Sequence, residues 1–295
     1  MKGVRIILDR KLYELTLEEL FPKTLFDTPC IYIDKSRDIW IVTEMCAEYL
    51  ESTIDAIVVK DEINPIGVIG GYDILYNLLQ NPTSTFFRTN IDKIFSKPLP
   101  QVDEKIKLVD LIENWKKTRR AFSVIANPKG DYFSISSRKF LEIGKQYKSG
   151  VSVSSIPKKK IISFKGYESL GAILDIMFKN HTRKILLENS NQFVSDRLIL
   201  GEISNLLKFQ EIDNLLDIPI NQFKFEYAKE ITTDLTLNQI CLIMDKMDHP
   251  CILYQDSIVT CWDICLILLS EKLTESSGKN YLQKKICPHC GKMID

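Results

Sequence analysis

A short strand that runs directly into a helix is predicted by the segment Ser257-Ile258-Val259-Thr260-Cys261-Trp262-Asp263. The first turn of a helix has N–H groups without intrahelical partners, so a junction of this kind readily holds phosphate. The hydroxyl of Thr260 could add a donor to that phosphate, and Asp263 could accept hydrogen bonds from a pair of sugar hydroxyls. The segment is also compatible with a structural role, in which Thr260 is the N-cap and Asp263 a favourable acid of the first turn.

The pattern around this segment is repeated along the chain. Apolar residues at positions i, i+3, i+4 and i+7 predict four helices, whose first apolar residues are 66, 62 and 67 residues apart (108 − 42, 170 − 108 and 237 − 170). An apolar run typical of a strand follows each helix, at residues 56–59, 121–125, 184–187 and 251–254. A polar turn, a second strand and a second helix complete each unit. The four helical sets are Val42/Met45/Cys46/Tyr49, Leu108/Leu111/Ile112/Trp115, Leu170/Ile173/Leu174/Met177 and Leu237/Ile240/Cys241/Met244.

A larger repeat groups the units in two pairs. The segment Ile91–Phe95, followed by Pro98, is matched 121 residues later (212 − 91) by Ile212–Leu216, followed by Pro219. One unit is too small to bury much apolar surface by itself, whereas two units packed sheet to sheet make a domain of ordinary size. We therefore expect an N-terminal extension (1–37), a first pair (38–89 and 90–149), a second pair (150–209 and 210–272) and a tail (273–295).

These units resemble cystathionine-β-synthase (CBS) domains, and each pair resembles a Bateman module, over about residues 38–272. The resemblance rests on the repeats and on a loose motif: Gly, two apolar residues, Thr or Ser, two variable residues and Asp. It implies an α/β fold, in which a small three-stranded sheet is flanked by two helices and two units pair through their sheets. It further implies clefts for adenosine nucleotides, with the Asp at the ribose and the Thr or Ser near the phosphates.

Units one and four keep the most of this motif. Unit four has both Thr260 and Asp263. Unit one, Gly67-Val68-Ile69-Gly70-Gly71-Tyr72-Asp73, keeps Asp73 but has Gly70 in place of the hydroxyl. Backbone N–H groups at this glycine could still approach a phosphate closely.

Units two and three depart further from the motif. Unit two keeps the hydroxyl as Ser136, but Lys139 stands where the Asp belongs. Ribose binding by a carboxylate is therefore lost there, and Arg138 or Lys139 could instead meet an anion. Unit three, taken over Arg197–Ser204, has neither a clear hydroxyl nor an aligned carboxylate.

Basic residues precede the apolar, strand-like run that follows the first helix of units two to four, and they could offer charge to phosphates at the mouth of a cleft. Arg183 and His249 are the candidates in the second pair. Cations are also well placed at solvated helix ends, which is the structural alternative. The run Lys158-Lys159-Lys160 is the best basic cluster, and we interpret it as a solvated loop rather than a nucleic-acid patch.

Composition indicates a globular chain, with 45% hydrophobic and 26% charged residues. Its 39 basic residues balance 39 acidic ones, which disfavours a protein that coats nucleic acid. Because no long apolar run and no secretory signal are found, we expect a cytosolic protein without a membrane span. Six of the eight cysteines lie in apolar runs as small hydrophobes. No Walker loop, Gly-x-Gly-x-x-Gly or nucleophile motif is present, so we expect no enzyme activity.

The tail contains Cys287-Pro288-His289-Cys290-Gly291, which has the shape of a zinc knuckle. A structural zinc site needs four ligands, so two chains of a homodimer could each supply Cys287 and Cys290, or a partner protein could complete the site. A redox-active pair and an unmetallated tail remain as alternatives.

Two hypotheses follow for function. The first is a regulatory sensor that binds an adenine nucleotide (AMP, ADP, ATP or the S-adenosylmethionine class) between units three and four, and possibly near Asp73, and signals to a protein partner. The second is a scaffold or nucleic-acid-associated adaptor with empty clefts that acts through its tail. Thr260 with Asp263 favours the first hypothesis, whereas the degraded motifs and the cysteine pair favour the second.

Overall fold

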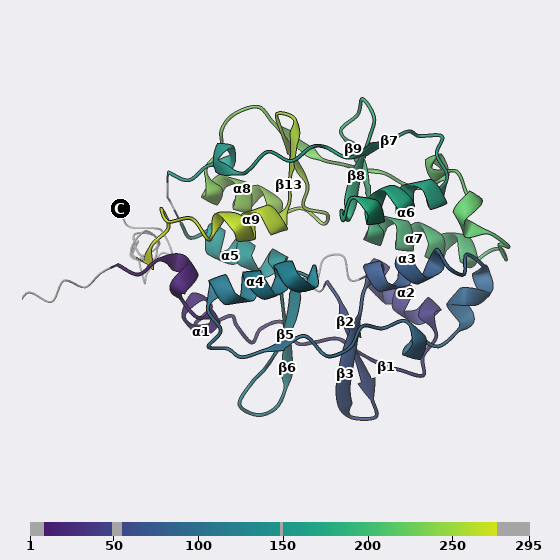
Figure 1. The fold of residues 1–295 in the computed structure, drawn as a ribbon, viewed down its shortest axis with the longest axis horizontal. Coiled ribbons are helices and arrows are strands. Elements are labelled where there is room, and N and C mark those ends of the chain that lie inside the picture. Colours follow the sequence, from purple (N-terminus) through teal and green to yellow (C-terminus); the bar gives the residue numbers. More distant parts are fainter. Residues whose placement is uncertain (1–8, 49–54, 148–149, 276–295) are drawn as a thin grey trace, which may run out of the picture.

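The computed structural model describes residues 9–48, 55–147 and 150–275 and contains four small sheets (Figure 1). In each unit a short first strand pairs in parallel with the second, and the second pairs antiparallel with the third. A further strand, β10 (Glu226–Tyr227), joins the edge of the third sheet. The units contain β1 (Tyr32–Asp34), β2 (Ile57–Asp61) and β3 (Asn64–Ile69); β4 (Gln101–Val102), β5 (Phe122–Ala126) and β6 (Tyr132–Ser136); β7 (Ser163–Phe164), β8 (Lys184–Leu187) and β9 (Gln192–Ser195); and β11 (Lys229–Ile231), β12 (Ile252–Tyr254) and β13 (Ser257–Val259).

All four helices predicted from the apolar repeat are confirmed over the described residues, outside which Tyr49 of the first set lies, and a second helix follows the third strand of every unit. The α-helices are α1 (Leu17–Leu20), α2 (Ile39–Glu48), α3 (Gly71–Leu78), α4 (Leu108–Thr118), α5 (Leu141–Gly144), α6 (Leu170–Lys179), α7 (Asp196–Leu207), α8 (Leu237–Met244) and α9 (Cys261–Ile267). Short 3-10 turns are η1 (Leu12–Glu14), η2 (Ser84–Arg88), η3 (Ile91–Lys93), η4 (Ser137–Phe140), η5 (Val153–Ser155), η6 (Leu215–Asp217) and η7 (Ile220–Gln222).

Within each pair the two units meet through their sheets. In the first pair Val58 and Val68 of unit one pack with Phe122 and Val124 of unit two. In the second pair Phe193 of unit three belongs to the matching cluster, together with Leu186, Cys251 and Leu253. The predicted α/β architecture of paired three-stranded units is therefore confirmed.

The two pairs close on each other through their helices, within one chain. Figure 1 shows the helices lying between the strands of the first pair and those of the second. Helices α2 and α3 of unit one contact α7 of unit three, and α5 of unit two contacts α8 and α9 of unit four. One large core thus joins units one and three, and another joins units two and four.

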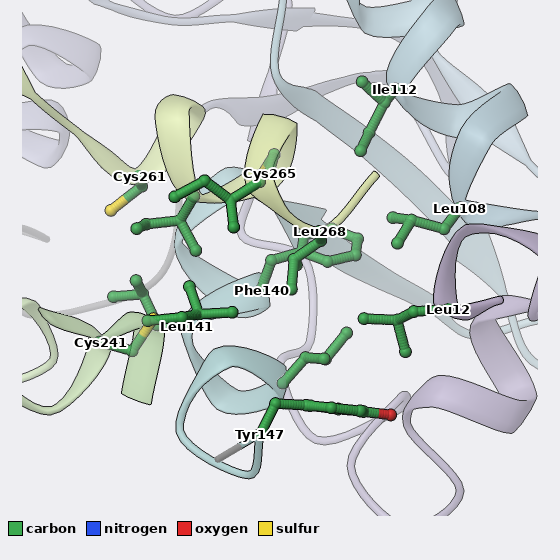
Figure 2. Packing of buried hydrophobic residues seen from close by; sticks show 14 of the residues in the cluster. Leu12, Leu108, Ile112, Phe140, Leu141, Tyr147, Cys241, Cys261, Cys265 and Leu268 are labelled. Carbon is green, nitrogen blue, oxygen red and sulfur yellow. The ribbon is translucent and has the colours of Figure 1, made fainter. Parts of the chain in front are cut away.

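The first part of the N-terminal extension, from Leu12 to Leu25, belongs to the second of these cores. Residues Tyr32–Asp34, which we had placed in the extension, form β1 and belong to the sheet of unit one. Figure 2 shows Leu12 beside Leu108 of α4, near Phe140 and Leu268. The backbone N–H of Leu12 donates to the carbonyl of Leu273 at 2.9 Å, so the extension also joins the end of unit four. The extension therefore stabilises the contact between units two and four.

Five cysteines of the described chain are buried as small apolar side chains, as predicted: Cys30, Cys241, Cys251, Cys261 and Cys265. Burial raises the pKa of the Cys261 thiol to about 12 and that of Cys30 likewise. These thiols remain protonated and unreactive at neutral pH.

The predicted zinc-knuckle pair, Cys287 and Cys290, lies outside the described residues. Among the residues that are described, no helix has both the length and the apolar character needed to cross a bilayer.

Candidate ligand clefts at the helix starts

The third strand of each unit ends at, or one residue before, the residue that caps the following helix, so the four motifs can be compared at equivalent positions. The cap is followed at the third helical position by the residue that corresponds to the motif Asp. These two positions hold Gly70 and Asp73 in unit one, Ser136 and Lys139 in unit two, Ser195 and Leu198 in unit three, and Thr260 and Asp263 in unit four.

The prediction that unit three lacks a hydroxyl is wrong. Strand β9 ends at Ser195, whose Oγ accepts a hydrogen bond from the N–H of Leu198 at 3.3 Å. The segment Arg197–Ser204, over which we had placed the motif, lies within α7, so its apolar run Leu198–Leu200 is helical. An apolar segment of this length suits a buried strand or a buried helical turn equally well.

In unit four, Thr260 is the N-cap of α9 and Asp263 is almost fully buried, with 1% of its surface exposed. The Oδ2 atom of Asp263 accepts from the N–H and the Oγ1 hydroxyl of Thr260, at 2.8 and 2.9 Å. Its Oδ1 atom forms an ion pair with the ammonium of Lys159, from the connector before β7. The hydroxyl and the carboxylate are therefore adjacent, as predicted, but the carboxylate already has an internal cation.

In unit one, Asp73 is engaged by three groups. Its Oδ2 accepts from the N–H of Gly70 at 2.8 Å, and its Oδ1 accepts from Ser96 Oγ at 2.6 Å. The guanidinium of Arg120, from unit two, lies 2.8 and 3.0 Å from the two oxygens. Because a charge-assisted pair of this kind is strong and 6% of Asp73 is exposed, this carboxylate is a structural anchor between units one and two.

In unit two, Lys139 does not face solvent and its partner belongs to the N-terminal extension. The side chain is 3% exposed, and its Nζ lies 2.6 Å from Asp27 and 2.7 Å from Glu142. Ser136 is buried at the start of η4. The expectation that Lys139 meets an external anion is therefore wrong, because Asp27 occupies that place.

Arg138 is also engaged, by unit four. Its guanidinium donates to the carbonyls of Met247 and Asp248, at 2.7 and 3.0 Å. This contact crosses from the first pair to the second and lies at the end of α8.

In unit three, Arg183 binds carboxylates of both pairs. Its guanidinium lies 2.7 Å from Asp196 and 4.0 Å from Asp55, and these charges raise the pKa of Arg183 against the opposing effect of burial. Asp55 also accepts from Arg197 at 3.3 Å. The side chain of Arg183 remains 46% exposed, so it can still contact a ligand.

Cationic and donor side chains meet at the contact between the pairs. Arg119 of unit two lies 2.7 to 2.8 Å from the ring nitrogens of His181 in unit three, and both residues have positive φ, 54° and 50°. Such a backbone conformation is uncommon for residues other than glycine. Two equivalent turns therefore bring an arginine and a histidine into direct contact where the two pairs meet.

His249 lies one residue before Pro250, close to the sheet contact of the second pair. Its ring is 6.5 Å from that of Phe193. Burial, followed by the positive charge of Lys184, lowers the pKa of His249 to about 4. His249 is therefore neutral in the ligand-free protein at pH 7, and only a nearby anion would favour its charged form.

We expect this histidine to make stability pH-dependent. The unfolded chain binds a proton at His249 below about pH 6.5, whereas the folded chain does so only near pH 4, so stability falls as the pH drops through this window. The loss reaches about 3 kcal/mol. In urea unfolding between pH 4 and 7, the stability of His249→Gln should depend less on pH than that of wild type. His181→Gln, at an exposed site, should keep the pH dependence of wild type. Equal dependence in both variants would contradict the assignment.

A shallow cavity of about 460 Å³ lies elsewhere, beside β4 and the loop after β5. Its lining includes the carboxylates of Asp103 and Glu104 and contains none of the predicted ligand residues. Acidic walls disfavour a phosphate, so this cavity is not a candidate nucleotide site.

No family model matches the sequence, and no curated protein does so either. Among solved structures, a protein of Methanocaldococcus jannaschii described as an archaeal homologue of γ-AMPK is similar, with a TM-score of 0.65 and 13% identity over 81% of this chain and 96% of that one. An uncharacterised conserved protein of Pyrococcus horikoshii matches with a TM-score of 0.48 and 13% identity over 74% and 92%. A CBS-domain protein of Agrobacterium tumefaciens has a TM-score of 0.35 and 14% identity over 41% and 92%. The likeness to the first of these is one of fold.

Proposed function

From the tandem CBS fold of this chain, we propose that it is a cytosolic regulatory protein, without catalytic activity of its own, that binds an adenine nucleotide between units three and four. Occupancy of this cleft would be signalled to a protein partner. The observation that carries the proposal is the start of α9, where Thr260 and the buried carboxylate of Asp263 lie 2.9 Å apart. A hydroxyl near phosphate and a carboxylate for ribose are the groups that such a ligand requires.

Electrostatics support an anionic ligand. Arg183 is half-exposed and Arg119 contacts His181 where the two pairs meet. Clusters of donors of this kind raise the local concentration of anions and stabilise bound phosphate. Arg183 of unit three also pairs with Asp55 of the first pair. A nucleotide that contacts Arg183 would therefore change how the two pairs pack, provided that it binds one arrangement more tightly.

The proposal is tested by calorimetric titration of the full chain, freed of co-purified ligand, with AMP, ADP, ATP and S-adenosylmethionine. We expect saturable heat with the nucleotides. Absence of heat with all four compounds would refute the sensor function.

A scaffold or adaptor role is the second candidate, and one observation favours it. In units one, two and four the residue at the motif Asp position is already bonded within the chain, to Arg120, Asp27 and Lys159 respectively. Such internal partners suit permanently closed clefts. In that case the protein would act through Cys287 and Cys290, which lie outside the described residues, with zinc shared across a homodimer.

A further inference from the structure

The connector before β7 lies across the start of α9. The backbone N–H of Lys159 donates to Ser257 Oγ at 3.1 Å, and the Lys159 ammonium pairs with Asp263. Unit three thereby reaches into the cleft of unit four, at the carboxylate that the proposed function assigns to ribose.

An equivalent contact, from the segment before a first strand to the helix start of the partner unit, occurs twice in the first pair. The connector before β4 places Ser96 on Asp73, and its backbone exchanges two hydrogen bonds with Val68, at 2.8 and 3.0 Å. The extension before β1 places Asp27 on Lys139. In each case a residue four or five positions before the first strand of one unit complements the third helical residue of the partner unit.

Lys159 differs from Ser96 and Asp27 because its side chain can leave its partner, Asp263. Its side chain is 47% exposed, whereas its partner Asp263 is 1% exposed. Asp73 has Arg120 as a second partner from across the pair, and in the Asp27 contact the buried member is Lys139. The Lys159 ammonium can move into water at little cost, whereas the buried Asp263 carboxylate that it leaves needs a replacement donor, which a ligand hydroxyl can supply.

We propose that Lys159 is an internal competitor for Asp263 that selects anionic ligands. This inference rests on the proposed function. When ribose hydroxyls take the place of the ammonium, the Lys159 charge needs a new partner. Two cations, Lys184 and Arg138, act on the thiol of Cys261, the first residue of α9, and they are opposed there by the carboxylates of Asp55 and Asp263. When a ribose occupies Asp263, that carboxylate is no longer the partner of Lys159. A phosphate supplies the missing negative charge, whereas adenosine has none and S-adenosylmethionine carries a cationic sulfonium.

The test is the ratio of affinities for AMP and adenosine, measured by calorimetry on the full chain. Wild type should prefer AMP by about tenfold or more, and should bind S-adenosylmethionine more weakly than AMP. Lys159→Gln keeps a donor for Asp263 but has no charge, so the preference for AMP should fall about tenfold while adenosine binds as well or better. Lys159→Arg should keep the preference.

Two neighbours serve as matched controls, because Lys158 and Lys160 are exposed in the same connector. Their glutamine variants should retain the wild-type ratio. If adenine compounds bind but Lys159→Gln leaves the ratio unchanged, or if S-adenosylmethionine binds as tightly as AMP, the inference about Lys159 is wrong and the nucleotide site stands. If no adenine compound binds wild type or the variant, the proposed function itself fails.

Discussion

Replacing Asp263 with asparagine is expected to weaken AMP binding by about ten- to a hundredfold, because a hydrogen bond to a charged group contributes about 1.5 to 3 kcal/mol. The amide oxygen can still accept from Thr260, whose N–H and hydroxyl lie 2.8 and 2.9 Å from the carboxylate, so the cap of α9 is retained. Calorimetry measures the affinity, and thermal unfolding verifies that the variant is folded.

Asp73→Asn is the matched variant, since Asp73 occupies the equivalent position in unit one. Arg120 and Ser96 already engage its carboxylate, so we expect AMP affinity to change less than about threefold, within the range of indirect effects. If Asp263→Asn binds AMP as tightly as wild type, or if both variants lose affinity equally, the assignment of the site to unit four is wrong.

Replacing Gly144 with alanine is expected to lower the free energy of unfolding by about 2 to 3 kcal/mol, as overpacking of a core does. A Cβ at Gly144 would overlap the Sγ of Cys241, which is fully buried in α8. This is the point where α5 of the first pair meets α8 of the second. The midpoint of urea unfolding measures the effect.

Two further variants show whether the overlap with Cys241 causes the loss of stability in Gly144→Ala. Cys241→Ala removes the sulfur, so the double variant Gly144→Ala/Cys241→Ala should recover much of the lost stability. Gly150→Ala should be almost neutral, because nothing lies within 4 Å of a Cβ at that position. A Gly144→Ala protein as stable as wild type would contradict the closure of the two pairs within one chain.

Much of the fold could be predicted because its helices are amphipathic. The sets beginning at Leu108 and Leu170 follow the helical period closely, and they form α4 and α6. The first strands were not found from the residue pattern, since β4 and β7 have two residues each and show no alternation. Their place in the sheet is set by the partner strand instead.

The candidate site could be predicted only in its local part. Thr260 and Asp263 are three residues apart and form the expected cap, so this spacing was informative. The partners Lys159 and Asp27 lie 104 and 112 residues from Asp263 and Lys139, and an ion pair across such a distance leaves no local signal in one sequence. Lys159, taken from the sequence as part of a solvated loop, is half-exposed and also paired.

The most direct measurement is a crystal structure of the full chain with AMP, at a concentration that saturates any heat seen by calorimetry. We predict that the ribose hydroxyls donate to Asp263 and that the Lys159 ammonium has left this carboxylate to meet the phosphate. Saturated crystals in which AMP lies elsewhere, with Lys159 still paired to Asp263, would contradict the account.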